Sequence, residues 1–360
     1  MNIKILGISV LLVAVTLFVW TRSFHSGSKI WSPIGETIES PAPTEQPYDK
    51  YSFERLATRA PVPSQIEIGR KLGETDKYTS YMFYYRSEGR RISGWMNIPT
   101  RTDLVGKMPV VVMARGYADR AGYTTGTGTK PAARVYAESG FITLAPDFSG
   151  YGESDAEDPD PFGARLTKPV EIVDLIASVG SLTQADTSHI YLWGHSNGGQ
   201  IMLSVAEILG KQEQMNKNIE YQVRGLVLWA PVSKPFPYSI LYYTDPAMDD
   251  SPPPLAAGAS PAPVDEGKAL RKSLATFENS YDVLQYSIDQ YWDWIQIPIQ
   301  LHQGTADPLV PKAWSDQLAK TLKDKGKTVV YYTYAGADHN LSTGWSTVVA
   351  RDVEWFKSLQ

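Results

Sequence analysis

Short apolar runs alternate with longer amphipathic segments from residue 64 to the end of the chain, and this alternation most constrains the fold. Runs rich in β-branched and aromatic residues that alternate with helical patterns are typical of a parallel sheet covered by helices on both faces. The expected strands are residues 78–86, 91–98, 109–114, 141–145, 190–193, 226–230, 297–302 and 328–334. The expected helices are residues 130–139, 169–179, 198–209, 311–325 and 347–358.

The sequence therefore predicts an α/β domain over residues 64–360, with an eight-stranded, mostly parallel sheet that opens on an antiparallel hairpin. One long segment, residues 233–296, interrupts the alternation and is expected to form a cap over the carboxyl ends of the strands. The cap is rich in rings, which either line an apolar substrate pocket or pack the cap onto the body. These rings are Phe236, Tyr238, Tyr242, Tyr243, Tyr281, Tyr286, Tyr291, Trp292 and Trp294.

Residues 194–199, Gly-His-Ser-Asn-Gly-Gly, stand directly between an apolar run and a helical pattern. Gly-x-Ser-x-Gly at a strand-to-helix turn is the pattern of a nucleophile elbow, in which glycines allow a sharp turn and the serine is held exposed. A helix-capping serine in a glycine-rich turn is the alternative interpretation. The pattern makes Ser196 the candidate nucleophile.

A serine hydroxyl needs a base in contact with it at neutral pH, and a histidine is the usual partner. Of the five histidines, His339 follows the last expected strand, which is where the chain order Ser, acid, His requires the base. The other four lie in the N-terminal segment, inside the elbow, or in and before apolar strands where packing is their expected role: His25, His195, His189 and His302. His339 is the candidate general base.

The acid that orients the histidine must lie between Ser196 and His339 and follow a strand. Asp307 meets both conditions, because it follows the expected strand over residues 297–302. A helix cap or an Asx-Pro turn is the alternative role for this residue. Asp338 is the competing acid, but it adjoins the histidine and its side chain normally cannot reach the far ring nitrogen.

The developing oxyanion of an acyl-transfer reaction needs two backbone donors. One is expected from Asn197, directly after the nucleophile. The other is expected from the loop at residues 113–118, where Gly116 permits a tight turn and Tyr117 N–H is the candidate donor.

These motifs together resemble the prolyl oligopeptidase-type catalytic domain of the α/β-hydrolase superfamily, in particular its stand-alone bacterial members. The resemblance covers residues 78–356 and rests on residues 85–94 (YRSEGRRISG), 145–154 (APDFSGYGES), 194–199, 228–233 (LWAPVS), 302–307 (HQGTAD) and 334–339 (YAGADH). It implies an α/β-hydrolase fold and a serine peptidase that acts on short peptides.

The chain differs from that family in two features. A histidine usually precedes the Gly-Tyr of the oxyanion loop, whereas Arg115 stands there in this chain, a change expected to bear on substrate preference rather than on mechanism. Full-length oligopeptidases also carry a large β-propeller, which the 63 residues ahead of the domain cannot build. Size selection is therefore expected from the cap.

The composition excludes several other classes of function. With 34 basic and 39 acidic residues the net charge is −5, which offers no basic face to nucleic acid. The chain has no cysteine and no His-Glu-x-x-His motif, and residues 126–130 lack the spacing of a phosphate-binding loop. We expect neither a metal nor a cofactor.

The first 25 residues are expected to be a targeting element, because residues 5–20 carry no charge and lie between Lys4 and Arg22. An uncleaved signal anchor that leaves the domain outside the cytoplasm is favoured, since no good cleavage site follows. A cleaved signal peptide and a buried core helix are the alternatives. Residues 26–63 are expected to be a Pro/Ser-rich linker, whose last part, residues 48–60, lies along the domain surface.

The sequence thus predicts an extracytoplasmic serine hydrolase with Ser196, His339 and Asp307 as its triad. A peptidase that acts on short peptides is favoured, a carboxylesterase that acts on small acyl esters is the alternative, and a catalytically dead binding protein is a third possibility. The sequence leaves the oligomeric state open.

Overall fold

The computed structural model describes residues 30–31, 37–38, 45–100, 106–215, 219–244 and 264–360. The chain divides into two compact units, Met1–Pro47 and Tyr48–Gln360. Within the first, β1 (Ile30–Trp31) pairs antiparallel with β2 (Thr37–Ile38). The predicted targeting segment lies outside the described residues. Among those that are described, no helix is long and apolar enough to cross a membrane.

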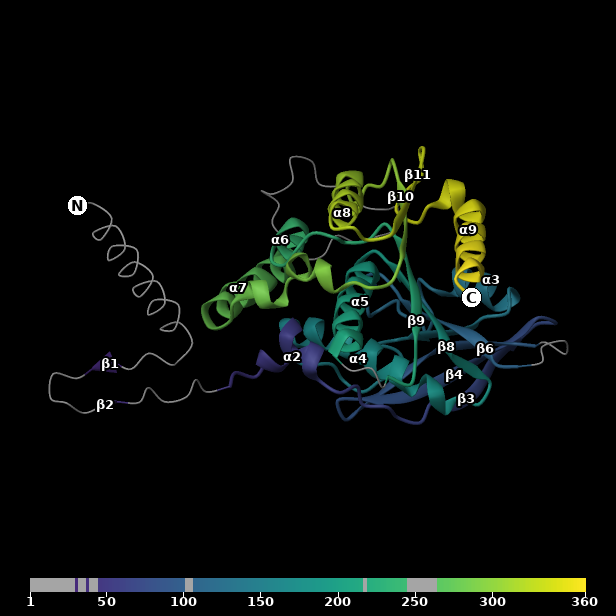
Figure 1. Ribbon diagram of the computed structural model, residues 1–360, viewed down its shortest axis with the longest axis horizontal. Helices are drawn as coiled ribbons and strands as arrows, with labels where there is room; N and C mark the ends of the chain where they lie inside the picture. The colour runs from purple at the N-terminus through teal and green to yellow at the C-terminus, as the bar shows by residue number, and fades with distance from the viewer. Residues whose placement is uncertain (1–29, 32–36, 39–44, 101–105, 216–218, 245–263) are drawn as a thin grey trace, which may run out of the picture. The chain divides into compact units, whose positions relative to one another are not determined.

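The second unit is built on a nine-stranded sheet of order β11-β10-β9-β8-β6-β7-β5-β4-β3 (Figure 1). Strands β11 to β7 are mutually parallel, and β5, β4 and β3 extend the sheet in antiparallel pairs. The strands are β3 (Glu67–Glu74), β4 (Tyr78–Ser87), β5 (Arg90–Pro99), β6 (Met108–Ala114), β7 (Ile142–Pro146), β8 (Ala185–His195), β9 (Val223–Trp229), β10 (Ile299–Gly304) and β11 (Val329–Tyr334).

All eight predicted strands are present, and β3 at the sheet edge is an additional one. Its sequence, EIGRKLGE, carries four charges, and its side chains are exposed or half-buried. An edge strand with little burial and many charges leaves no apolar pattern in the sequence, so the sequence does not predict it.

Helices cover both faces of the sheet, as the sequence predicts, because alternate strand residues point to opposite sides. On β6, Val110 and Val112 pack with the first core, which includes residues of α4 (Pro161–Ser178), α5 (Asn197–Met215) and α8 (Lys312–Asp324). Val111 and Met113 pack with the second core, under α3 (Lys130–Glu138) and α9 (Trp345–Ser358) (Figure 1).

Helix α4 begins eight residues earlier than predicted, at Pro161 instead of residue 169. The Asp160 side chain caps it by accepting hydrogen bonds from the N–H groups of Phe162 and Gly163, at 2.7 and 3.3 Å. Pro169 lies inside the helix, whereas proline is usual only in the first turn. That preference led the prediction to start the helix too late.

The inserted segment over residues 233–296 separates β9 from β10. It contains α6 (Tyr238–Thr244), α7 (Val264–Ser280) and the 3-10 helices η4 (Val283–Tyr286), η5 (Ile288–Gln290) and η6 (Trp292–Trp294). Several of its rings pack within the fold: Tyr281 stacks on Phe277 with ring centroids 4.5 Å apart, and Tyr291 and Trp292 are buried.

The predicted linker over residues 26–63 is too long, because the second unit begins at Tyr48. Tyr51 lies in a short 3-10 helix, η1 (Asp49–Tyr51), while Phe53 and Leu56 lie on α2 (Phe53–Thr58). All three side chains are buried, and the Phe53 ring stacks on Tyr291 at 4.5 Å. These apolar side chains make residues 48–63 part of the domain rather than a tether.

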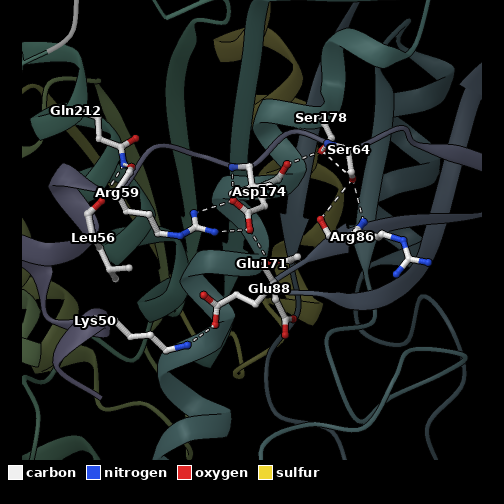
Figure 2. Close-up of polar contacts among 12 residues, drawn as sticks. Lys50, Leu56, Arg59, Ser64, Arg86, Glu88, Glu171, Asp174, Ser178 and Gln212 are labelled. Atoms are coloured by element: carbon white, nitrogen blue, oxygen red, sulfur yellow. Dashed lines mark hydrogen bonds and ion pairs between the residues drawn. The ribbon is translucent and has the colours of Figure 1, made fainter. Parts of the chain in front are cut away.

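Asp174 on α4 anchors the chain that follows α2 (Figure 2). This fully buried carboxylate accepts two hydrogen bonds of 2.8 Å from the Arg59 guanidinium. It also accepts from Val62 N–H at 2.9 Å and from the Ser87 hydroxyl at 2.7 Å. Gln212 of α5 donates to the carbonyls of Leu56 and Arg59, both at 2.9 Å.

Replacing Asp174 by alanine should lower the free energy of unfolding by about 3–5 kcal/mol, because three donors, one of them charged, lose a buried acceptor. Lys50→Ala is the matched control, since the Lys50–Glu88 ion pair is partly exposed and should contribute no more than about 1 kcal/mol. Urea unfolding measures both. Equal losses in the two variants would contradict the anchoring role of Asp174.

Candidate active site

Ser196 lies in the turn between β8 and α5 and adopts the left-handed backbone conformation, with φ of 56°. A residue with a side chain rarely holds this conformation unless its surroundings enforce it. Here Ser196 N–H donates to the Trp229 carbonyl at 2.9 Å, and the Ser196 carbonyl accepts from Val232 N–H at 2.9 Å. Both partners flank the end of β9, so the neighbouring strand fixes the elbow.

The glycines of the elbow are required by close backbone packing. A Cβ atom on Gly198 would lie 2.1 Å from the Ala114 carbonyl oxygen at the end of β6. A Cβ atom on Gly194 would lie 2.6 Å from the Gly198 carbonyl oxygen. Any larger residue at either position would push α5 away from the sheet, so the sequence pattern and the geometry agree.

Asp307 and His339 follow the neighbouring strands β10 and β11 and meet at the carboxyl edge of the sheet. His339 Nδ1 lies 2.9 Å from Asp307 Oδ2. Both side chains are buried, with the carboxylate fully enclosed. This contact occupies Nδ1 and leaves Nε2 as the ring nitrogen that can act as a base.

The Asp307 carboxylate is held in place by its own loop. Oδ1 accepts from the N–H groups of Leu309 and Val310 at 2.8 and 2.9 Å, and Gln303 Nε2 donates to Oδ2 at 3.0 Å. Burial by itself would raise the pKa of Asp307, but the hydrogen bond from His339 and these backbone donors outweigh it, and the pKa is lowered. The group therefore stays ionised beside the imidazole.

Asp338, the competing acid, faces its own turn instead of the imidazole. Its carboxylate accepts from the N–H groups of Asn340 and Ser342 and from the Ser342 hydroxyl, at 2.9 to 3.1 Å. These contacts lower its pKa against the effect of burial. The structure thus brings Asp307, and not Asp338, to His339.

His195, to which the sequence analysis gave no role, supports the histidine loop. Its Nε2 lies 3.0 Å from the His339 carbonyl oxygen, and the two imidazole rings are 4.7 Å apart. Burial, followed by the charge of His339, lowers the pKa of His195 to about 4. The ring is therefore neutral at pH 7 and donates through Nε2–H. Its position next to Ser196 was the only sequence signal.

The loop after β6 runs alongside the serine. A Cβ atom on Gly116 would lie 2.9 Å from Ser196 Cβ and 3.5 Å from Ser196 Oγ. Only glycine allows the backbone to approach so closely, and the approach brings the next peptide group, that of Tyr117, to the neighbourhood of the hydroxyl. Tyr117 as a whole residue is 80% exposed.

Arg115 supports this loop from inside the protein rather than facing solvent. Its guanidinium donates to the carbonyls of Gly116 and Asp147 at 2.9 and 3.1 Å. It also lies over the Tyr151 ring, 4.0 Å from the centroid, and is only 5% exposed. We therefore expect Arg115 to stiffen the oxyanion loop, so any influence on substrate preference, which the sequence analysis expects of this position, would act through that loop.

The side chains of Ser196 and His339 do not form a hydrogen bond with each other in the structure described here. Catalytic hydrogen bonds are often long in unliganded enzymes and tighten when substrate binds. The strand order β11-β10-β9-β8 nevertheless brings the loops that carry both residues to one edge of the sheet.

A cavity of about 70 Å³ opens beside Asn197, the residue after the candidate nucleophile. Two rings of the predicted cap line it, Phe236 and Tyr286, and so do residues of the segment around α2. Its wall also includes Tyr51, Phe53, Leu56, Arg165, Leu166, Lys168, Pro169, Gln200, Ile201, Ser204, Ile208, Ser239 and Ile288. Some rings of the cap thus line this cavity, whereas others pack the cap onto the rest of the domain.

Asp307→Asn should lower kcat by about 10⁴-fold, because the amide would favour the wrong imidazole tautomer. Asp338→Asn is the matched control and should change kcat by less than about tenfold, since a partly exposed neighbouring charge perturbs the base weakly. Steady-state kinetics on one ester substrate measures both. The reverse order of effects would make Asp338 the orienting acid.

Comparison with known proteins gives the same architecture. No curated protein matches the sequence. Acetyl xylan esterase 1 from Thermoanaerobacterium sp. JW/SL YS485 is similar in structure, with a TM-score of 0.57, 15% identity, and coverage of 86% of this chain and 93% of that chain. The Pyrococcus horikoshii acylaminoacyl peptidase has a TM-score of 0.57 and 16% identity, with coverage of 81% of this chain and 44% of that one.

A third similar structure, an acetyl xylan esterase from Paenibacillus sp. R4, has a TM-score of 0.58 and 17% identity over 84% of this chain and 91% of that chain. At these identities the likeness shows the fold alone. Residues 111–356 also match the sequence pattern of the Alpha/beta hydrolase family, which is more than half of the chain. The chain therefore belongs to the alpha/beta hydrolase family.

Proposed function

We propose that this protein is a serine hydrolase that transfers the acyl group of a small carboxylic ester to water. The observation that carries this proposal is the contact of 2.9 Å between His339 Nδ1 and Asp307 Oδ2, at the sheet edge where Ser196 is held in a strained turn. Acyl transfer needs a buried carboxylate, an imidazole with one nitrogen left for proton transfer and a serine held in a sharp turn, and the site has all three.

In the proposed mechanism, Ser196 Oγ attacks the ester carbonyl carbon while His339 Nε2 takes the hydroxyl proton. Asp307 stabilises the imidazolium that forms. The carbonyl oxygen becomes an oxyanion that accepts from the N–H groups of Asn197 and Tyr117. The intermediate then collapses, and His339 gives its proton to the leaving alcohol. Water, deprotonated by His339, attacks the acyl-enzyme; the bond from the acyl carbon to Ser196 Oγ then breaks, His339 returns the proton to Oγ, and the acid is released.

The charges around the cavity favour esters over peptides with a free amino terminus. Arg165 and Lys168 line it, and no acidic side chain does so among the described residues. An ammonium group would be repelled there, and none of the described wall residues carries a carboxylate that would pair with it. The preference for short peptides that the family resemblance suggests stays a prediction, and amide substrates test it directly.

Matched substrates distinguish the two activities. We expect p-nitrophenyl acetate and butyrate to be hydrolysed with kcat/KM at least a hundredfold above that of acetyl- and prolyl-p-nitroanilides, because amides need efficient protonation of a poorer leaving group. Spectrophotometry of the released chromophore measures both series. Anilide turnover equal to or above ester turnover would overturn the esterase proposal in favour of a peptidase.

Ser196→Ala should abolish the acyl-enzyme and leave only residual turnover, about 10³ to 10⁴ above water, from binding and the oxyanion donors. Ser358→Ala, at an exposed position of α9, is the matched control and should keep full activity. Ester hydrolysis with each variant gives the comparison. Undiminished turnover in Ser196→Ala would exclude this serine as the nucleophile.

We also propose that residues 5–20 anchor the protein in a membrane with the hydrolase domain outside the cytoplasm, on the basis of their uncharged sequence. The full-length protein should then sediment with membranes and resist carbonate extraction. A protein that starts at Tyr48, where the second unit begins, should be soluble and equally active. A processed amino terminus near Lys29 in the soluble fraction would identify a cleaved signal peptide instead.

A further inference from the structure

Two cationic side chains of α4 line the cavity beside the candidate nucleophile. Arg165 and Lys168 are three residues apart, so they lie on the same face of the helix. Arg165 Nη1 approaches Asn197 Oδ1 at 3.5 Å, which places the guanidinium next to the turn that carries Ser196. Both side chains are half-buried.

Within the part of the chain that the structure describes, one carboxylate acts on these cations: the charge of Glu171 raises the pKa of Lys168, although the two side chains form no ion pair. The two residues form no ion pair there, and the cavity wall includes no acidic side chain. Glu171, one turn further along α4, is engaged by Ser149, which donates from its hydroxyl at 2.6 Å and from its N–H at 3.2 Å. Burial also raises the pKa of Glu171 to about 7, so its negative charge is incomplete at neutral pH.

The two positive charges are costly in this setting. Burial, followed by the charges of Arg165 and Arg115, lowers the pKa of Lys168 to about 7. Burial lowers the pKa of Arg165 as well. Half-buried like charges that have only one partly ionised carboxylate near them destabilise a fold unless something else compensates them, and an anion in the cavity would do so.

We propose that the cavity binds a carboxylate at the end of the substrate's acyl chain, so that the preferred substrates are monoesters of short dicarboxylic acids. The proposal rests on the ester-hydrolase function given above. The arginine fork can bind a carboxylate through two parallel hydrogen bonds, and the Lys168 ammonium adds a point charge.

The position of the cavity favours the acyl part of the ester, rather than the alcohol part, as its occupant. Asn197 borders the cavity and supplies the proposed donor to the carbonyl oxygen, so the proposal places the acyl chain, rather than the alcohol, in the cavity. Leu56, Phe236 and Ile208 give the wall the apolar surface that a few methylene groups require. The cavity is small, at about 70 Å³, which suits a short chain.

Monoethyl glutarate and ethyl valerate make a matched pair for the test, because both carry a five-carbon acyl chain and only the first ends in a carboxylate. Hydrolysis by the full-length protein is followed by pH-stat at neutral pH. We expect kcat/KM for the glutarate monoester to exceed that for ethyl valerate by about tenfold or more, the effect typical of a charge-assisted hydrogen bond.

Arg165→Gln and Lys168→Gln should each lower this ratio about tenfold. The ratio is the measured quantity, because Arg165 also contacts Asn197 and its loss can slow both substrates. Arg55→Gln is the matched control: it removes one positive charge from an exposed position of α2 outside the cavity and should leave the ratio unchanged. Circular dichroism melting curves establish that each variant is folded.

Calorimetric titration of the full-length Ser196→Ala protein with glutarate separates binding from catalysis. We expect glutarate to bind, and Arg165→Gln in the same background to weaken binding about tenfold. If the protein hydrolyses ethyl valerate but shows no preference for the charged ester and does not bind glutarate, the anion site is overturned and the proposed function stands. If the protein binds glutarate but hydrolyses neither ester, the proposed function alone is overturned. If the preference for the glutarate monoester survives in both Arg165→Gln and Lys168→Gln, the assignment of these two residues is overturned.

Discussion

The left-handed conformation of Ser196 depends on backbone contacts that the surrounding sheet enforces. Its N–H and carbonyl form hydrogen bonds with backbone groups at and just after the end of β9. Gly198 lies so close to the Ala114 carbonyl that no side chain would fit at position 198. The strain of a positive φ at a serine is thereby offset by hydrogen bonds and helix packing. The hydroxyl, the oxyanion loop and the start of α5 all take their positions from this turn.

The site is connected to a part of the chain far away in sequence. Tyr51, Phe53 and Leu56 form one wall of the cavity, and the chain just beyond them is bound by Asp174 of α4. The same helix supplies Arg165 and Lys168 to another part of the wall. Helix α4 therefore both anchors the segment that closes the cavity and gives the cavity its charge.

The sequence predicts the parallel core and the parts of the site that depend on local patterns. Buried strands have apolar runs, and Gly-x-Ser-x-Gly imposes its own turn, so Ser196, Asp307 and His339 could be chosen from chain order. Features that depend on tertiary contacts could not be read from the sequence. Edge strand β3 carries charges, and α4 runs through Pro169, which local preference would exclude.

Three side chains illustrate the same limit at the site. His195 supports the His339 loop through a contact between residues 144 positions apart, which no local pattern signals. Arg165 and Lys168 precede the predicted helix over residues 169–179 and carry no sequence signal of burial, and only the packing of α2 and the cap against α4 encloses them.

The central claim is that Ser196 is an activated nucleophile, and covalent labelling tests it most directly. Intact-protein and peptide mass spectrometry after exposure to a fluorophosphonate should show a single adduct, located on Ser196. Heating the protein to unfold it before exposure should abolish the adduct, because the serine is activated only by the folded site. An unlabelled native protein, or an adduct on a different serine, would contradict the account.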